Sequence, residues 1–249
     1  MSEPEFLETS AGRRLAYHKF GGRRVGVVFL GGLRSDMTGT KAVHLEGWAR
    51  RSGREFLRFD YSGHGQSSGR FEDGAVSEWA EDAIHAIEAL TEGPQVLVGS
   101  SMGGWVALLL AKYRPETLAG LVTIAAAPDF TEIGYWEQWS EAERKAIKEK
   151  GRIALPSEYG DALVITRKMI EDGRTIRVLT EPLRIDVPVR LLQGTADTDV
   201  PPEVALRLLD HLDGPDIHLE LVKDADHRFS DPACLDTLTR AVEEVVVHA

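Results

Sequence analysis

Short apolar segments alternate with longer amphipathic stretches along most of the chain. The apolar segments are rich in Val, Ile and Leu, and their near-continuous hydrophobicity is typical of strands in a sheet covered on both faces. They occupy residues 25–30, 55–60, 95–98, 119–126, 188–192 and 217–222. Helical spacing occurs between them, at residues 41–52, 75–92, 102–113, 202–212 and 232–248. This order predicts βαβ units and a mostly parallel, doubly wound sheet.

Two further segments near the start of the chain, residues 5–9 and 14–20, have the pattern of an antiparallel hairpin. We expect this hairpin to join one edge of the sheet, which then has eight strands. No internal repeat, low-complexity tract or linker divides the chain into independent domains. The sequence therefore predicts one α/β core, formed by residues 1–128 and 186–249.

Residues 129–185 interrupt the alternation. They contain helical patterns at 138–150 and 160–172 but no convincing central strand. An insertion of this length is usually a functional lid or cap, so we expect a helical cap within the same domain. The alternative is a helical elaboration that faces the solvent.

The net charge of the chain excludes some kinds of binding partner. The 249 residues include 29 Lys and Arg against 40 Asp and Glu, which gives a formal net charge of −11. A field of this sign repels nucleic acids and anionic membrane surfaces, and it favours neutral substrates. The single cysteine, Cys234, permits no internal disulfide and is expected to be a packed thiol.

The first twelve residues are acidic and polar, unlike a signal or transit peptide, and no stretch of the sequence approaches the length of a transmembrane helix. We therefore expect a cytoplasmic protein with no nucleic-acid partner and no stable membrane association.

The residues from Gly99 to Gly103 fit the pattern G-x-S-x-G, with Ser101 at its centre. The pattern follows the predicted strand 95–98 and precedes an apolar helical run, and this strand–turn–helix setting presents a serine hydroxyl at the carboxyl edge of a sheet. The turn needs glycines two positions before and after the serine because its neighbours are crowded. Ser101 is therefore the predicted nucleophile, the alternative being an idle serine in a glycine-rich turn. Ser100 is excluded because the glycines do not match in that register.

An oxyanion formed by attack of this serine needs two backbone donors. The N–H of Met102 lies at the start of the following helix, where it can stabilise negative charge. The second donor is expected in a loop after an earlier strand. Gly31-Gly32-Leu33 forms such a loop, and the N–H of Leu33 is the candidate. A simple diglycine turn is the competing interpretation.

In this architecture the acid and the histidine follow the nucleophile in the chain. Among the histidines after Ser101, only His227 lies in a polar loop after the final predicted strand. The others lie in a helical pattern, in a strand and near the C-terminus, at His211, His218 and His248 respectively. His227 is therefore the predicted base, with an ordinary surface histidine as the alternative.

Two aspartates, Asp197 and Asp199, lie in the loop after the predicted strand 188–192. Either carboxylate can accept the imidazole N–H and stabilise the imidazolium that forms during attack. The other is then a turn or helix-capping residue. Spacing alone does not decide between them.

One further histidine, His64, lies in a loop punctuated by glycines at residues 60–67. We expect this loop to fix a tight turn rather than to perform chemistry. The sequence contains no metal-binding cluster, phosphate-cradling loop or dinucleotide fingerprint. It therefore predicts no cofactor and no metal.

These motifs together resemble the α/β-hydrolase superfamily over nearly the whole chain. Within the superfamily the chain is similar to a narrower group, α/β-hydrolase domain-containing protein 10 and its bacterial relatives, which are palmitoyl-protein thioesterases and acyl-glucuronide esterases. The resemblance is carried by GGLRSDMTGTKA (31–42), RFDYSGHGQSSG (58–69), LVGSSMGGW (97–105), RLLQGTADTDVP (190–201) and DADHR (224–228).

The resemblance implies the α/β-hydrolase fold, with Ser101 as nucleophile and His227 as base. The superfamily pattern G-x-x-D-x-x-V-P matches the chain with Asp197 as its acid, which decides between the two aspartates. Animal members of the narrower group carry a mitochondrial transit peptide, whereas this chain begins almost directly at its first strand, as we expect of a bacterial relative.

The predicted activity is hydrolysis of carboxylic esters or acyl thioesters through an acyl-enzyme intermediate, with a small-molecule substrate or an acylated protein as partner. The alternatives are a carboxylesterase or lactonase without thioesterase activity, and a non-enzymatic hydrolase-like receptor. We expect the cap to supply an apolar wall for the acyl group, formed by Trp136, Trp139 or Met169. Trp105, one turn beyond Ser101, is expected to pack in the core.

Overall fold

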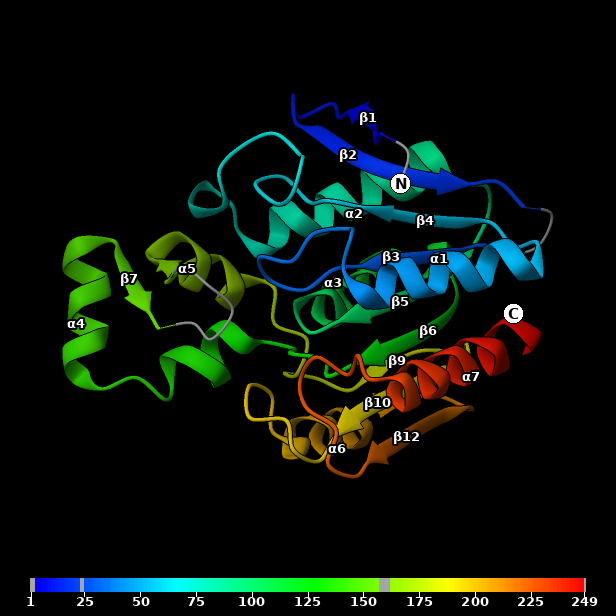
Figure 1. Cartoon of the computed structure of the whole chain (residues 1–249). Helices are drawn as coiled ribbons and strands as arrows, with labels where there is room; N and C mark the ends of the chain where they lie inside the picture. Colours follow the sequence, from blue (N-terminus) through cyan, green and yellow to red (C-terminus); the bar gives the residue numbers. More distant parts are fainter. Residues whose placement is uncertain (1–2, 23–24, 157–161, 249) are drawn as a thin grey trace.

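Figure 1 shows the fold as a computed structural model, which describes residues 3–22, 25–156 and 162–248. Its centre is an eight-stranded sheet with the order β1-β2-β4-β3-β5-β6-β10-β12. The strands are β1 (Glu5–Glu8), β2 (Arg14–Phe20), β3 (Val27–Leu30), β4 (Phe56–Phe59), β5 (Gln95–Ser100), β6 (Leu118–Ile124), β10 (Val189–Gly194) and β12 (Ile217–Val222). β1 and β2 form an antiparallel hairpin at one edge, β2 is also antiparallel to β4, and every later pair is parallel. The predicted mostly parallel sheet of eight strands is confirmed.

Helices cover both faces of this sheet. They are α1 (Thr40–Ser52), α2 (Val76–Leu90), α3 (Met102–Tyr113), α6 (Pro202–His211) and α7 (Pro232–His248). α1 and α7 share one buried cluster with the strands, whereas α2, α3 and α6 belong to a cluster on the opposite face. Strand β5 shows how the sequence produces the two layers, because successive side chains of a strand point to opposite faces. Val96 and Val98 belong to the α1–α7 side, and Leu97 between them belongs to the other.

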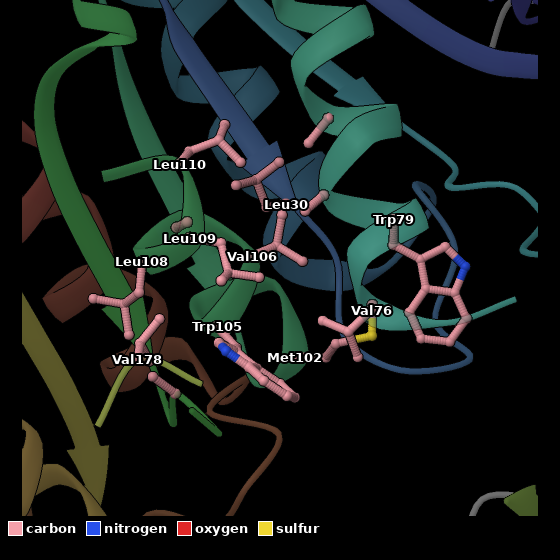
Figure 2. Packing of buried hydrophobic residues seen from close by; sticks show 14 of the residues in the cluster. Leu30, Val76, Trp79, Met102, Trp105, Val106, Leu108, Leu109, Leu110 and Val178 are labelled. Atoms are coloured by element: carbon pink, nitrogen blue, oxygen red, sulfur yellow. The ribbon is translucent and has the colours of Figure 1, made fainter. Parts of the chain in front are cut away.

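The helix that follows the predicted nucleophile is buried around almost its whole circumference. An apolar helix with no polar face is typical of the interior of a domain. Figure 2 shows Val106 of α3 near Leu30 of β3, and Met102 near Val76 of α2. Trp105 is 0% exposed, as expected for a core residue. The turn before α3 is therefore held in place by a helix that is packed tightly in the core.

The insertion lies beyond the carboxyl ends of β6 and β10, at the left of Figure 1. Its elements are η3 (Thr131–Trp136), α4 (Glu141–Lys150), β7 (Arg152–Leu155), β8 (Leu163–Thr166), α5 (Arg167–Thr175) and β9 (Leu183–Arg184), the last of which pairs with β11 (Leu212–Asp213). Two short 3₁₀ turns complete the described elements, η1 (Phe71–Asp73) and η2 (Pro115–Thr117). η3 is a π-helical turn, a form that often occurs near functional sites.

The structure agrees with one of the two predicted insertion helices and corrects the other. The pattern at 138–150 is α4, which begins after Ser140 in a capping box with Glu143. Within 160–172, however, Leu163–Thr166 forms a strand antiparallel to β7, and the helix begins only at Arg167. The run Leu-Val-Ile-Thr favours a strand because Val, Ile and Thr are β-branched. Residues 160 and 161 of that prediction lie outside the described residues.

No helix in the described part of the chain is both long enough and apolar enough to cross a membrane.

Candidate active site

Ser101 lies in the turn between β5 and α3 with a strained backbone. Its φ is 54° and its ψ is −118°, in a region that residues other than glycine seldom adopt. Two hydrogen bonds hold this conformation. The Ser101 N–H donates to the carbonyl of Ile124 on β6 (2.9 Å), and the Ser101 carbonyl accepts from the Ala127 N–H (3.1 Å). The turn is therefore fixed by the neighbouring strand as well as by its own helix.

The two glycines that flank the serine are required by close backbone approaches. A Cβ at Gly99 would lie 2.3 Å from the carbonyl oxygen of Gly103, and a Cβ at Gly103 would lie 2.0 Å from that of Leu30. Neither distance is sterically allowed. This geometry is the crowding that the G-x-S-x-G pattern predicts for a serine in a strand–helix turn.

A continuous row of hydrogen bonds joins Ser101, His227 and Asp197. His227 Nε2 is 3.1 Å from the Ser101 Oγ, and His227 Nδ1 is 2.9 Å from the Asp197 Oδ2. With the carboxylate ionised, Nδ1–H donates to Asp197, which leaves Nε2 as an acceptor for the serine hydroxyl. The Asp197 side chain is 0% exposed and the His227 side chain is 18% exposed. The structure thus brings together the three residues predicted from the sequence, from the loops after β5, β10 and β12.

The Asp197 carboxylate is held by its own loop. Its Oδ1 accepts the N–H groups of Asp199 (2.9 Å) and Val200 (2.8 Å), and its Oδ2 accepts from the Gln193 side-chain amide (3.0 Å). Burial acts to raise the pKa of Asp197, but the hydrogen bonds from His227, Val200 and Gln193 outweigh it and the pKa is lowered. Asp197 is therefore ionised at neutral pH.

Asp199, the other aspartate of this loop, has an exposed side chain. Its backbone N–H donates to Asp197, so it supports the carboxylate that faces the imidazole. α6 begins after Pro201, its N-cap residue, whose side chain makes no capping bond.

The loop expected to complete an oxyanion site lies against Ser101. A Cβ at Gly32 would be 3.4 Å from the Ser101 Cβ, which is van der Waals contact, so the loop packs directly against the serine. Within the described residues, the N–H groups of Leu33 and Met102 donate to no protein acceptor. Both donors are therefore available to a ligand, as an oxyanion site requires.

The three cap residues predicted to contact substrate have protein neighbours in this structure. Trp139 is 7% exposed and stacks on Tyr135, and Met169 is 0% exposed. Trp136 is half-buried, with the Arg174 guanidinium 4.2 Å from its ring centre. Their contact with an acyl group stays a prediction.

Tyr135 is a cap residue that the sequence interpretation left without a role. Its ring is edge-on to Phe130, which in turn is edge-on to Trp105 of α3, so a row of aromatic rings joins the core to the cap. Burial and the nearby Asp199 carboxylate raise the pKa of Tyr135 to about 12. The spacing of Phe130 and Tyr135 was the available signal, but the contact of Phe130 with α3 depends on the fold.

Gln193 is a second residue that sequence reasoning missed. It is 0% exposed at the carboxyl end of β10, and its side-chain amide donates to both Asp197 and the carbonyl of Val200 (3.0 Å). The signal was a polar residue at the end of a strand that is otherwise apolar.

His64 and Cys234 take no part in this arrangement. His64 is 3% exposed, its Nδ1–H donates to the Ser62 carbonyl (3.1 Å), and its ring packs edge-on against Trp79. Burial lowers the pKa of His64 to about 4, so the imidazole is neutral inside its turn. Cys234 is buried, as expected for a packed thiol.

A family model described as the Alpha/beta hydrolase family matches residues 27–235, and the chain belongs to this family. The sequence is 36% identical over 243 residues to the mitochondrial palmitoyl-protein thioesterase ABHD10 of Mus musculus, which covers 97% of this chain and 82% of that protein.

Two solved structures resemble the whole chain. A hydrolase from Agrobacterium vitis S4 superposes with a TM-score of 0.92 at 39% identity, and 98% of each chain is covered. The alpha/beta hydrolase domain-containing protein 10 from mouse superposes with a TM-score of 0.91 at 34% identity, also over 98% of each chain. The resemblance to the α/β-hydrolase superfamily and to this narrower group is confirmed, and with it the class of the protein: an α/β hydrolase.

Proposed function

We propose that this chain is a serine hydrolase that cleaves carboxylic esters or acyl thioesters by means of a Ser-His-Asp triad. The observation that carries the proposal is the hydrogen-bonded row from Ser101 through His227 to the buried Asp197. These residues come from three separate loops, and a chance alignment of a hydroxyl, an imidazole and an ionised carboxylate is rare outside catalytic sites.

In the first half of the reaction, His227 Nε2 takes the Ser101 proton while Oγ attacks the carbonyl carbon of the ester or thioester. Asp197 holds the imidazole in the correct tautomer and stabilises the imidazolium. The N–H groups of Met102 and Leu33 donate to the oxyanion, each contributing about 3 kcal/mol. The imidazolium then protonates the leaving alkoxide or thiolate, and the acyl group remains on Ser101.

In the second half, His227 removes a proton from water as the water attacks the acyl-enzyme. The imidazolium then returns this proton to the Ser101 Oγ as the bond to the acyl group breaks, and the carboxylic acid is released. The acyl chain of the substrate lies under the cap, where the proposed wall of Trp136, Trp139 and Met169 excludes water. The substrate class follows the printed name of the ABHD10 relative, a palmitoyl-protein thioesterase. A small-molecule thioester and an acylated protein present the same reacting group, the acyl thioester.

A carboxylesterase or lactonase without thioesterase activity is the main alternative, because the same triad serves all three reactions. A location in the cytoplasm stays a prediction from composition, since the ABHD10 relative is named as mitochondrial.

The test combines labelling of the serine with a comparison of substrates. A fluorophosphonate probe should label the wild-type chain and not Ser101→Ala. Wild type should hydrolyse both a short p-nitrophenyl ester and a palmitoyl thioester, with a higher kcat/KM for the thioester, and Ser101→Ala should lose more than about a hundredfold in kcat.

Each failure has a distinct meaning. Turnover of the short ester alone would support the carboxylesterase. Neither labelling nor turnover in the folded wild-type protein would favour the non-enzymatic receptor. Residual turnover above about a hundredth of the wild-type kcat in Ser101→Ala would show that another group is the nucleophile.

A further inference from the structure

Lys41 occupies a position that is unfavourable for a lysine in two respects. It is the second residue of α1, and a cation in the first turn of a helix is disfavoured by the positive end of the helix dipole. No acidic residue lies in that turn to compensate, and the Lys41 side chain is partly buried. A residue that contradicts local preferences without an evident gain in stability often serves function.

The ammonium group of Lys41 reaches the loop that carries His227. Its Nζ donates a hydrogen bond to the carbonyl oxygen of Arg228, the residue directly after His227. The contact joins residues 187 positions apart in the chain. The Arg228 carbonyl also accepts from the Ser230 hydroxyl (2.7 Å). Of these two donors, Lys41 is the one that is distant in the sequence.

On the N-terminal side of His227, the same loop is hydrogen-bonded to the loop that carries Asp197. The Ala225 carbonyl accepts the Ala196 N–H (3.0 Å), and the Asp224 N–H donates to the Thr195 hydroxyl (2.9 Å). His227 therefore lies between an anchor at Ala225 and an anchor at residue 228. The position of an imidazole ring follows the backbone on both sides of it, and a shift of about 1 Å is enough to impair a catalytic hydrogen bond.

We propose that Lys41 is a positioning residue, which holds the backbone after His227 through its hydrogen bond to Arg228 and so keeps the imidazole aligned between Ser101 and Asp197. The inference rests on the proposed function. It also gives a role to the segment DMTGTKA at residues 36–42, which the triad leaves unexplained.

The electrostatic surroundings of Lys41 support a functional rather than a stabilising role. Burial lowers the pKa of Lys41 to about 8 and the Arg228 charge acts in the same direction, whereas Asp226, Cys234 and Asp197 act to raise it. The folded pKa lies below the value of 10.5 that an exposed lysine has. The charged form is thus penalised by folding, fully below about pH 8 and not at all above about pH 10.5. At neutral pH the charge of Lys41 lowers the stability of the fold.

The test compares Lys41→Met, which keeps the length of the side chain, with Lys41→Arg, which keeps the donor and the charge. Lys112→Met is the matched control, because Lys112 also donates to a backbone carbonyl, that of Arg177 (3.0 Å), but from an exposed position. Lys41→Met should lower kcat by about tenfold or more, with KM changed less than about twofold and with Tm unchanged or higher at pH 7. Lys41→Arg should recover part of kcat, and Lys112→Met should leave it unchanged.

One readout separates positioning from a structural role. Amide hydrogen exchange in residues 224–231 should be about tenfold faster in Lys41→Met at unchanged global stability. An unchanged exchange rate in this loop would overturn the inference whatever the activity. A parallel fall in kcat and Tm would overturn it in favour of a structural lysine. Absence of turnover in wild type would contradict the proposed function, and the exchange experiment would still decide the role of Lys41.

Discussion

Asp197 and Asp199 lie two positions apart in one loop, yet their carboxylates have different surroundings. Asp197 is buried, accepts four hydrogen bonds from His227, Gln193 and two backbone amides, and has a lowered pKa. Asp199 has an exposed side chain and contributes its backbone N–H to Asp197. A substitution that keeps the shape of either residue therefore distinguishes their roles.

Asp197→Asn should lower kcat by about 10³–10⁴-fold, because an amide can donate to the imidazole and hold it in the wrong tautomer. Asp199→Asn keeps its backbone N–H and should change kcat by less than about threefold. Steady-state hydrolysis of a p-nitrophenyl ester at one pH measures both variants. A large loss in Asp199→Asn with a small one in Asp197→Asn would assign the acid to Asp199.

At the residue scale, the order of motifs in the chain was sufficient to select Ser101 and His227. The choice of Asp197 needed the family pattern, because two aspartates in one loop have almost the same local sequence. Gln193 and Lys41 could not be assigned in advance. Each acts through hydrogen bonds to backbone or side-chain atoms that only the tertiary structure brings into reach.

Among the elements, the insertion has its two ends joined to each other by one side chain. Asp129, at the start of the insertion, is 0% exposed, and its two oxygens accept the N–H groups of Val178 (2.8 Å) and Leu179 (3.0 Å) near the end of the insertion. Its φ of 54° is in the left-handed region, which Asp and Asn tolerate better than most residues. Asp129 thus closes the base of the cap.

Asp129→Asn keeps the tolerated backbone but turns one acceptor into a donor that faces a buried N–H. We expect the free energy of unfolding to fall by about 2–4 kcal/mol, since a buried amide then lacks its charged partner. Urea denaturation measures the loss, and limited proteolysis should cleave first within residues 129–185. Asp172→Asn is the control. Asp172 also lies in the insertion, but it is half-buried and accepts the Ser77 N–H, so its replacement should lower the free energy of unfolding by less. Equal stability of Asp129→Asn and wild type would show that the hydrogen bonds of Asp129 to Val178 and Leu179 do not stabilise the insertion.

The internal structure of the cap was harder to predict than its position. The interruption of the alternating strands and helices located the insertion, and the helical spacing at residues 138–150 predicted α4. The β7–β8 hairpin was missed because each of its strands has only four residues, and such short apolar runs fit a helix or a strand equally well. Pairing between the two strands decides the outcome.

For the whole molecule, the mostly parallel sheet and its covering helices follow from the long periodic segments, which are the most reliable signals in a sequence, whereas the order of the strands in the sheet does not. The cooperative stability of this core depends on groups that periodicity does not show. His64 is one of them, because it lies in the loop after β4 and packs against Tyr61, Phe71 and Trp79 beneath α2. Its burial connects the protonation of one imidazole to the folding of the entire domain.

The folded pKa of His64, about 4, lies below the ordinary value of 6.5, so protonation of His64 favours the unfolded chain. This penalty is absent above about pH 6.5, grows as the pH falls, and is complete below about pH 4. It amounts to about 3 kcal/mol of lost stability. His64→Phe suits the aromatic surroundings and removes the titration, and the Ser62 carbonyl keeps the Trp79 indole N–H as a donor (3.1 Å).

Urea denaturation between pH 7.5 and pH 4 should therefore show a decline that is smaller by about 3 kcal/mol in His64→Phe than in wild type. His218→Phe serves as the control for the same substitution at an exposed imidazole, which lies 3.1 Å from the Asp216 carboxylate. If the free energies of unfolding of His64→Phe and wild type decline in parallel over this range, the acid sensitivity of the fold comes from other groups. Protonation of the buried His64 then does not destabilise the protein.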